Sequence, residues 1–258
     1  MRGKKMNEIE KQLKTLRLNG ILNTLESRAV QFSQSNVGFA EGLSWLLQDE
    51  LDHRSSCLRQ RRFKASGLDE LKTLSDFDWG FNPKLPKKQI YELVTAKFIQ
   101  NGEHALLIGA PGTGKSHVAK TIAHAAVQAM LKTVYREAHV FFEDMFEAEQ
   151  TDRKKKVIKI FAEADLLVID DLFLRKKMPD EAADYLVDII IERYSKRKST
   201  VITSNRPVDD WGQLLKDNAA SSVILDRLLH HGHLLKFEGK SYRLKEAAQR
   251  LSNNTKKS

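Results

Sequence analysis

The chain has 258 residues, a formal net charge of +9 and a hydrophobic content of 41%, which is ordinary for a globular protein and allows one large core or one core with a smaller appended domain. The single cysteine, Cys57, excludes an internal disulfide, and no apolar run approaches the roughly 18 residues that a membrane span needs. The sequence therefore predicts a cytoplasmic protein that does not bind a membrane, and its positive charge favours polyanionic partners such as nucleic acid.

The first 75 residues have the pattern of amphipathic helices. Apolar residues recur at helical spacing over residues 7–33, with a break expected near Gly20. A second helical stretch starts near Phe39 and ends at "CLRQRRFKASG", where basic side chains precede a glycine. We predict an all-helical domain over residues 1–75 whose basic side chains form a candidate phosphate-contacting surface, and these side chains are Arg54, Arg59, Arg61, Arg62 and Lys64. A solvated helix end, favourable to the helix dipole, explains the same basic cluster equally well.

A change of composition marks the next segment. "SDFDWGFNPKLPKK" starts at Ser75 and carries one glycine and two prolines that interrupt regular structure, so we expect a linker and a domain boundary near residue 75. Beyond it, strand-like runs at residues 104–108, 133–137, 166–169 and 200–203 alternate with helical stretches such as 115–131 and 180–196. This alternation predicts an α/β fold over residues 76–258, with a parallel sheet flanked by helices.

A glycine-rich stretch, "GAPGTGKS", follows the first of these strands and matches the phosphate-binding pattern G-x-x-x-x-G-K-[ST]. Its glycines allow a tight turn whose N–H groups point inward, and the next helix presents its positive end to the same phosphates. Lys115 supplies a cation for the β and γ phosphates, and Ser116 supplies a hydroxyl for Mg²⁺. The pattern predicts binding of ATP with Mg²⁺ by Gly109, Ala110, Pro111, Gly112, Thr113, Gly114, Lys115 and Ser116.

Two carboxylates end the apolar run "DLLVIDDLF", residues 165–173. The carboxyl ends of parallel strands meet at one edge of a sheet, which is the edge where the phosphates are expected. Asp170 is predicted to hold Mg²⁺ through its water shell, and Asp171 to orient or deprotonate an attacking water. A loop cap or a surface salt bridge is the alternative for Asp171.

Other polar residues follow later strands and helices. Asn205, in "STVITSNRP", could bond a γ-phosphate or a water, although Asn-Arg-Pro is also an ordinary turn sequence. Arg227 lies on an amphipathic helix and Arg243 follows a strand and a turn, and either could be a surface arginine. The histidines at 230, 231 and 233 have no accompanying cysteines, so we predict no structural metal.

The order and wording of these motifs resemble the AAA+ ATPases of the DnaA/DnaC group, and most closely the IstB-like transposition helper proteins. The resemblance rests on "GAPGTGKSHVA", "LLVIDDL", "TSNRPVDDWG", "ILDRLLHHG" and "GKSYRLKE", and "QDELDHRSSCLRQRRFKAS" resembles the family's basic N-terminal helix. It implies that Asn205 is the sensor-1 residue, that Arg227 is an arginine finger reaching a neighbouring subunit's nucleotide, and that Arg243 is a sensor-2 candidate. It also implies an ATPase that assembles as a homo-oligomer on duplex DNA and recruits and stimulates a transposase.

One residue departs from the wider AAA+ pattern. Asp171 stands where glutamate is more usual, and its shorter side chain leads us to expect slow hydrolysis that suits a timing switch. Two other functions fit the sequence: a helicase loader similar to DnaC, which would prefer single strands, and a DNA-binding protein that holds nucleotide without catalysis.

The residues after Lys245 and three basic runs elsewhere in the chain lead to further predictions. After Lys245 we expect only a short helix and a polar tail. We therefore do not expect a C-terminal helix-turn-helix that recognises DNA sequence. The basic runs at 153–156, 175–177 and 196–198 either contact DNA or face water.

Overall fold

The computed structural model describes residues 2–35, 37–174 and 178–255. The basic run at 175–177 lies outside the described residues. The chain divides into two compact units, Met1–Arg61 and Arg62–Ser258. The predicted pair of domains with a boundary near residue 75 stays a prediction. None of the helices within the described ranges combines the length and apolar content that a bilayer crossing requires.

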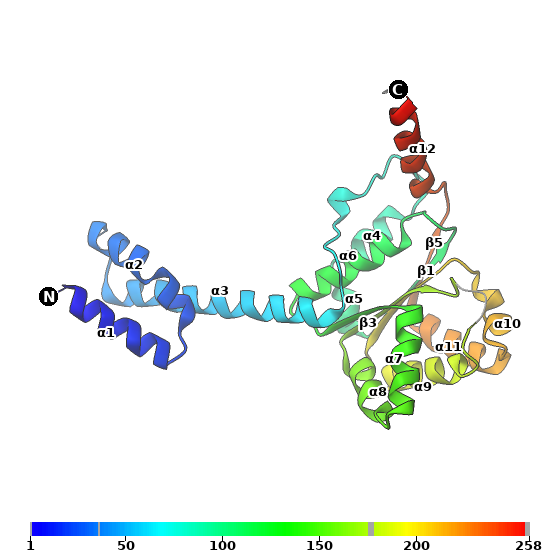
Figure 1. Ribbon diagram of the computed structural model, residues 1–258, viewed down its shortest axis with the longest axis horizontal. Coiled ribbons are helices and arrows are strands. Elements are labelled where there is room, and N and C mark those ends of the chain that lie inside the picture. Colours follow the sequence, from blue (N-terminus) through cyan, green and yellow to red (C-terminus); the bar gives the residue numbers. More distant parts are fainter. Residues whose placement is uncertain (1, 36, 175–177, 256–258) are drawn as a thin grey trace. The chain divides into compact units, whose positions relative to one another are not determined.

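The first unit is built from helices, as Figure 1 shows for α1 (Arg2–Thr15), α2 (Asn19–Gln34) and the start of α3 (Phe39–Ser66). The predicted break falls between α1 and α2, just before Gly20. A Cβ atom on Gly20 would lie 2.6 Å from the Cα of Glu50, a separation that carbon atoms do not tolerate. Glycine at this position therefore permits the close approach of α2 to α3.

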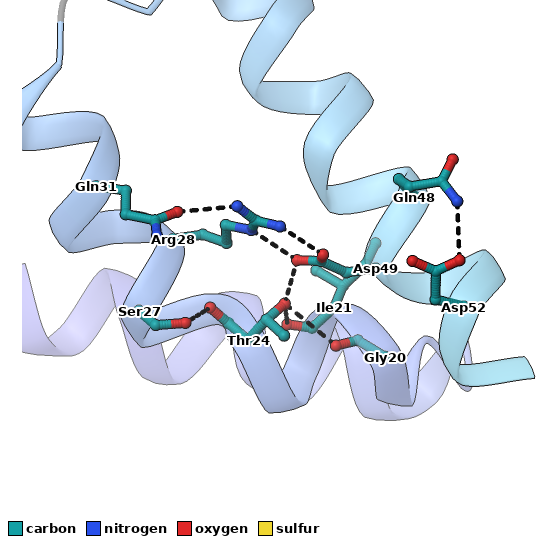
Figure 2. A network of polar contacts seen from close by, with 9 residues as sticks. All are labelled: Gly20, Ile21, Thr24, Ser27, Arg28, Gln31, Gln48, Asp49 and Asp52. Atoms are coloured by element: carbon teal, nitrogen blue, oxygen red, sulfur yellow. Dashed lines mark hydrogen bonds and ion pairs between the residues drawn. The ribbon is translucent and has the colours of Figure 1, made fainter. Parts of the chain in front are cut away.

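Polar side chains join α2 to α3 within this unit (Figure 2). The Arg28 guanidinium donates to both carboxylate oxygens of Asp49, at 2.8 and 2.7 Å, and the Thr24 hydroxyl donates to the same carboxylate at 2.7 Å. The bond from Arg28 holds the pKa of the Asp49 carboxyl below its usual range. This bidentate pairing fixes the rotation of α2 against α3.

A second carboxylate of α3, that of Glu50, caps the N-terminus of α2. Glu50 is buried and accepts hydrogen bonds from the backbone N–H groups of Gly20 and Ile21, at 2.7 and 3.3 Å. Its other oxygen accepts from Arg54 at 2.7 Å. Glu50 thus satisfies two of the N–H groups that a helix leaves unbonded in its first turn.

The second unit contains a five-stranded sheet in the order β2-β3-β4-β1-β5. Each adjacent pair of strands is parallel, and the strands are β1 (His104–Gly109), β2 (Thr133–Glu137), β3 (Leu166–Leu172), β4 (Ser199–Ser204) and β5 (Gly232–Phe237). The four predicted strands are confirmed, and β3 extends beyond its predicted end to include Asp170 and Asp171. The predicted fold class, an α/β fold with a parallel sheet flanked by helices and a helical N-terminal region, is therefore correct.

Helices cover both faces of this sheet (Figure 1). One face packs on α4 (Lys87–Val94), α5 (Lys97–Asn101) and α6 (Lys115–Gln128), and the other on α7 (Ala138–Gln150), α8 (Lys154–Glu163), α9 (Ala182–Ser195), α10 (Trp211–Leu215) and α11 (Asn218–His230). Short 3-10 helices, η1 and η2, cover Leu74–Asp76 and Val208–Asp210, and α12 (Tyr242–Thr255) follows β5. Neighbouring residues of one strand serve opposite faces, since Leu106 belongs to the core under α7 and Leu107 to the core under α6.

Candidate functional site

A pocket of about 520 Å³ lies at the carboxyl ends of the central strands. Its walls come from the loop after β1, the end of β3, the segment before α4 and the start of α12. The predicted site residues that line it are Gly112, Thr113, Gly114, Lys115, Ser116, Asp170, Asp171 and Arg243. Parallel strands with their crossover helices bring these distant parts of the sequence to one edge.

The loop after β1 leads directly into α6, which starts at Lys115. Gly114 precedes the helix with φ +102°, a left-handed conformation that L residues rarely adopt. A Cβ at this position would also lie 2.6 Å from the ring of Phe77. Lys115, Ser116 and His117, the first residues of α6, line the pocket, and the first turn of a helix favours an anion. The described residues that line the pocket do not include Gly109, Ala110 and Pro111.

Lys115 is only 4% exposed. Its ammonium donates to the carbonyl oxygens of Gly109 and Ala110, at 2.8 and 2.9 Å. Burial lowers the pKa of Lys115, and the carboxylates of Asp171 and Asp170 act in the opposite direction. A positive charge is thus buried within the loop beside two negative charges.

Asp170 and Asp171 both line the pocket, although adjacent residues of a regular strand point to opposite faces. Asp171 has φ +56°, and the pairing of β3 with β4 shifts register between Ile169 and Leu172. This irregularity turns the second carboxylate toward the first. Burial and the nearby Asp170 carboxylate raise the pKa of Asp171, while Lys115 and Arg243 oppose that rise.

The oxygen atoms at this edge suit a hard divalent cation. Ser116 offers a hydroxyl and Asp170 a carboxylate in one pocket, and Mg²⁺ prefers oxygen ligands, often one or two carboxylates with several retained waters. A cradle of backbone N–H groups adjoins them at the start of α6. The residues present therefore fit a phosphate-bound Mg²⁺ ion.

Two predicted catalytic residues do not line the pocket in the described part of the chain. Asn205 directly follows β4, and its buried side-chain oxygen has no hydrogen-bond partner among the described residues. Arg227, on α11, donates to the carbonyl oxygen of Val223 at 3.0 Å, and its guanidinium lies 5.9 Å from the ring centroid of Tyr194. Of the three later candidates, only Arg243 meets the predicted carboxylates and lysine in one pocket.

The segment interpreted as a linker forms one wall of the pocket, through Asp76, Phe77, Asp78, Phe81 and Asn82. Asn82 exchanges two hydrogen bonds with the backbone of Lys240, at 3.0 and 2.9 Å. The ring of Phe81 also meets that of Tyr242, at 5.3 Å between centroids. The prolines and the glycine of this segment led us to expect irregular backbone. Its aromatic residues were the sequence signal that the segment packs against other parts of the chain.

Sequence reasoning also missed Tyr135 and Thr203. Tyr135 lies on β2 and donates to Asp170 at 2.5 Å, and Thr203 lies on β4 and donates to the other oxygen of the same carboxylate. Their strands flank β3. The available signal was a tyrosine within β2 and a threonine one residue before the end of β4, because a buried hydroxyl needs a partner.

The predicted DNA-binding residues all lie on α3. Arg54, Arg61 and Lys64 are exposed and Arg59 and Arg62 are half-buried. Arg54 is paired with Glu50 at 2.7 Å, and one buried nitrogen of Arg62 has no partner in the described part of the chain. Within the first unit, a hollow of about 430 Å³ is lined by Arg17, Asn19, Glu50, His53, Arg54, Cys57, Leu58 and Arg61.

The other basic runs already hold ion pairs within the chain. Lys154 lies 3.0 Å from Glu149, Lys196 lies 2.7 Å from Glu192, and Lys198 lies 2.6 Å from Asp165. Such pairs reduce the charge that the runs at 153–156 and 196–198 present to a polyanion.

Comparison with known proteins gives consistent matches. Residues 11–250 match the family described as IstB-like ATP binding protein. A Geobacillus stearothermophilus protein, named for insertion sequence IS5376 and for ATP binding, is 33% identical over 214 residues, which cover 83% of this chain and 84% of that protein. A Pseudomonas aeruginosa protein, named in the same way for insertion sequence IS21, is 31% identical over 252 residues, 97% of this chain and 94% of that protein.

Solved structures with the same fold include replication proteins. The DnaC helicase loader matches with a TM-score of 0.51 and 22% identity over 58% of this chain and 87% of that chain. AMPPCP-bound DnaA from Aquifex aeolicus matches with a TM-score of 0.54 and 23% identity over 72% of this chain and 56% of that chain. At this identity the likeness concerns the fold alone.

Proposed function

The chain belongs to the family of IstB-like ATP binding proteins, and from this premise we propose that it is an ATPase that assembles on duplex DNA and recruits and stimulates a transposase. One observation carries the enzymatic part: a single pocket joins the glycine loop, Lys115, Ser116 and two carboxylates. The insertion-sequence names of relatives that align along most of this chain support the role in transposition. The predicted cytoplasmic location is part of the proposal.

The glycine loop and Lys115 bind the phosphates of ATP. Backbone N–H groups at the start of α6 face the phosphate oxygens, and the Lys115 ammonium exchanges its loop carbonyls for the β and γ phosphates. Ser116 and Asp170 are the residues that would hold Mg²⁺, which neutralises phosphate charge when bound.

Asp171 accepts a proton from the attacking water. Its raised pKa makes the carboxylate a stronger base than an ordinary aspartate once it is ionised. Asn205 orients the water or the γ-phosphate from the end of β4, and Arg243 contacts the γ-phosphate from α12. Because an aspartate reaches less far than a glutamate, turnover is slow and suits a timing switch.

Arg227 acts on the nucleotide of a neighbouring copy. Within its own chain this guanidinium packs on Tyr194 and is not among the described residues that line the pocket. An arginine supplied in trans stabilises transition-state charge only after subunits meet. Hydrolysis thereby depends on homo-oligomer assembly.

Duplex DNA binds to the basic end of α3 in this proposal. Residues 1–75 form the DNA-binding domain and residues 76–258 the ATPase domain. The contacts are made by Arg54, Arg59, Arg61, Arg62 and Lys64, so binding depends steeply on salt and little on sequence. The net charge of +9 favours this polyanionic partner.

ATP hydrolysis tests the proposal. Purified wild-type chain, Lys115→Ala and Asp171→Asn are compared with and without duplex DNA. We expect slow wild-type hydrolysis that duplex stimulates, and a loss of at least about 100-fold in both variants, the size typical of removing one transition-state contact. Equal rates in all three chains would instead support a DNA-binding protein that holds nucleotide without catalysis.

A pull-down separates the proposal from a helicase loader with the same fold. The chain, loaded with ATP and duplex, is offered the transposase of its own element and a replicative helicase. Capture of the transposase is expected, whereas capture of the helicase and a preference for single strands would favour the loader.

A further inference from the structure

The Asp170 carboxylate is held from both sides by hydroxyl groups of neighbouring strands. Tyr135, on β2, donates to Oδ2 at 2.5 Å, and Thr203, on β4, donates to Oδ1. Asp170 itself is 2% exposed. Each oxygen therefore has one bond to the protein and retains a lone pair for a further partner.

The Tyr135 hydroxyl is fixed as a donor in this arrangement. An ionised carboxylate has no proton to donate, so the phenol O–H of Tyr135 donates and Asp170 accepts. The ring lies 5.6 Å from the Lys120 ammonium, and Asp69 holds that lysine at 2.8 Å. Both Tyr135 and Lys120 line the pocket.

The Thr203 hydroxyl joins the two carboxylate residues. It donates its single proton to Asp170 and accepts a hydrogen bond from the backbone N–H of Asp171 at 2.8 Å. That N–H belongs to the residue with φ +56° at which β3 loses regular pairing. One side chain of β4 thus fixes the direction of the first carboxylate and the backbone of the second.

We propose that Tyr135 and Thr203 are positioning residues that aim the free lone pairs of Asp170 at the water shell of nucleotide-bound Mg²⁺. The inference rests on the proposed function, since it concerns the metal of the same ATP site. Partners that orient a metal-binding carboxylate change metal affinity by 10- to 100-fold when they are removed. Loss of either hydroxyl should therefore weaken the response to Mg²⁺ and leave metal-free nucleotide binding intact.

Binding of a fluorescent ATP analogue, titrated with Mg²⁺ and repeated in EDTA, tests this role without reference to turnover. Tyr135→Phe and Thr203→Val each remove one hydroxyl and keep the shape of the side chain. We expect the Mg²⁺ concentration that gives half of the metal-dependent binding to rise about tenfold in each. Affinity in EDTA should match that of the wild-type chain.

Two variants serve as matched controls. Tyr185 donates to Glu149 at 2.5 Å but is not among the described residues of the pocket, so Tyr185→Phe removes the same type of bond elsewhere and should leave the Mg²⁺ midpoint unchanged. Thr203→Ser keeps the hydroxyl and should restore the wild-type midpoint. The comparison of Thr203→Val with Thr203→Ser is sufficient for the test. The test therefore remains valid if Tyr135→Phe does not fold.

The outcomes separate this inference from the proposed function. A wild-type chain whose nucleotide binding ignores Mg²⁺ overturns both. Clear Mg²⁺ dependence in the wild type, with the same midpoint in Thr203→Val, Thr203→Ser and any folded Tyr135→Phe, overturns the positioning role alone. An equal loss of affinity in EDTA and in Mg²⁺ also overturns it, because that pattern reports general damage to the pocket.

Discussion

The two compact units of the chain bury their apolar side chains to different extents. In the second unit, the sheet residues Leu106 and Leu107 are 0% exposed and helices pack on both faces. In the first unit, Phe39 is 86% and Leu51 is 58% exposed. Polar contacts from Asp49 and Glu50 join its helices.

This difference explains where the chain can hold reacting groups in fixed positions. Tyr135, Asp170 and Thr203 extend from strands whose other residues lie in a close-packed core, so their hydroxyl and carboxylate groups meet within hydrogen-bond distance. Among the described residues of the first unit, Leu13 and Ile21 are the buried apolar side chains. In the proposed binding of a duplex, contacts of the basic end of α3 to phosphates depend on charge and carry no sequence information.

The largest effect on stability is expected at Arg193. This side chain is fully buried and donates to Thr200 Oγ1 at 2.9 Å, to the carbonyl oxygen of Ala164 at 2.9 Å and to the carbonyl oxygens of Phe161 and Ser199. Arg193→Met leaves these acceptors without donors, and the free energy of unfolding should fall by at least about 3 kcal/mol. Urea unfolding measures the loss.

Arg250→Met is the control for Arg193, since Arg250 is exposed on α12. It should change the free energy of unfolding by less than about 0.5 kcal/mol. Equal losses in the two variants would show that burial of Arg193 does not stabilise the second unit.

One leucine from each unit tests the contrast in packing directly. Leu106→Ala removes a fully buried side chain and should lower the free energy of unfolding by about 3 kcal/mol, because it loses transfer energy and leaves a cavity. Leu51→Ala removes an exposed one and should cost less than about 0.5 kcal/mol. Similar losses by denaturant titration would contradict the assignment of the core to the second unit.

A smaller effect is expected at the polar contacts of the first unit. Glu50→Ala removes the acceptor of the Gly20 and Ile21 N–H groups and should cost about 1 kcal/mol, as loss of a helix cap does. Hydrogen exchange should speed up at these two amides first. Glu26→Ala, an exposed carboxylate on α2, should leave that exchange unchanged, and a uniform acceleration in both variants would argue against the cap.

The smallest and opposite effect is expected at Asp171. Its pKa is raised in the folded chain, so ionisation above that pKa favours the unfolded chain. An asparagine side chain also tolerates the left-handed backbone found at this position. At pH 7 we expect Asp171→Asn to raise the Tm while it abolishes hydrolysis. The gain should shrink as pH falls toward the ordinary aspartate pKa of about 3.9, and a lower Tm at pH 7 would show that the ionised side chain stabilises the fold.

Sequence reasoning predicted the sheet well because β1 and β3 contain the continuous apolar runs that are typical of buried parallel strands. It also predicted that Lys115 and Asp170 lie close together, because the phosphate-binding loop and the carboxyl ends of parallel strands occur at the same edge of a sheet. The bulge that turns Asp171 toward Asp170 could not be predicted, because it depends on the pairing of β3 with Thr203 of β4. The role of Phe81 and Asn82 in the wall was also missed, since their partners lie more than a hundred residues later in the sequence.

The central claim, that one copy's arginine completes another copy's ATP site, is tested most directly by mixing two inactive variants. Lys115→Ala lacks a working phosphate loop but keeps Arg227, whereas Arg227→Ala keeps its own loop and lacks the finger. The account predicts that each variant alone hydrolyses almost no ATP on duplex DNA, and that the mixture regains a substantial part of the wild-type rate. A mixture no more active than the sum of its two components would contradict the account.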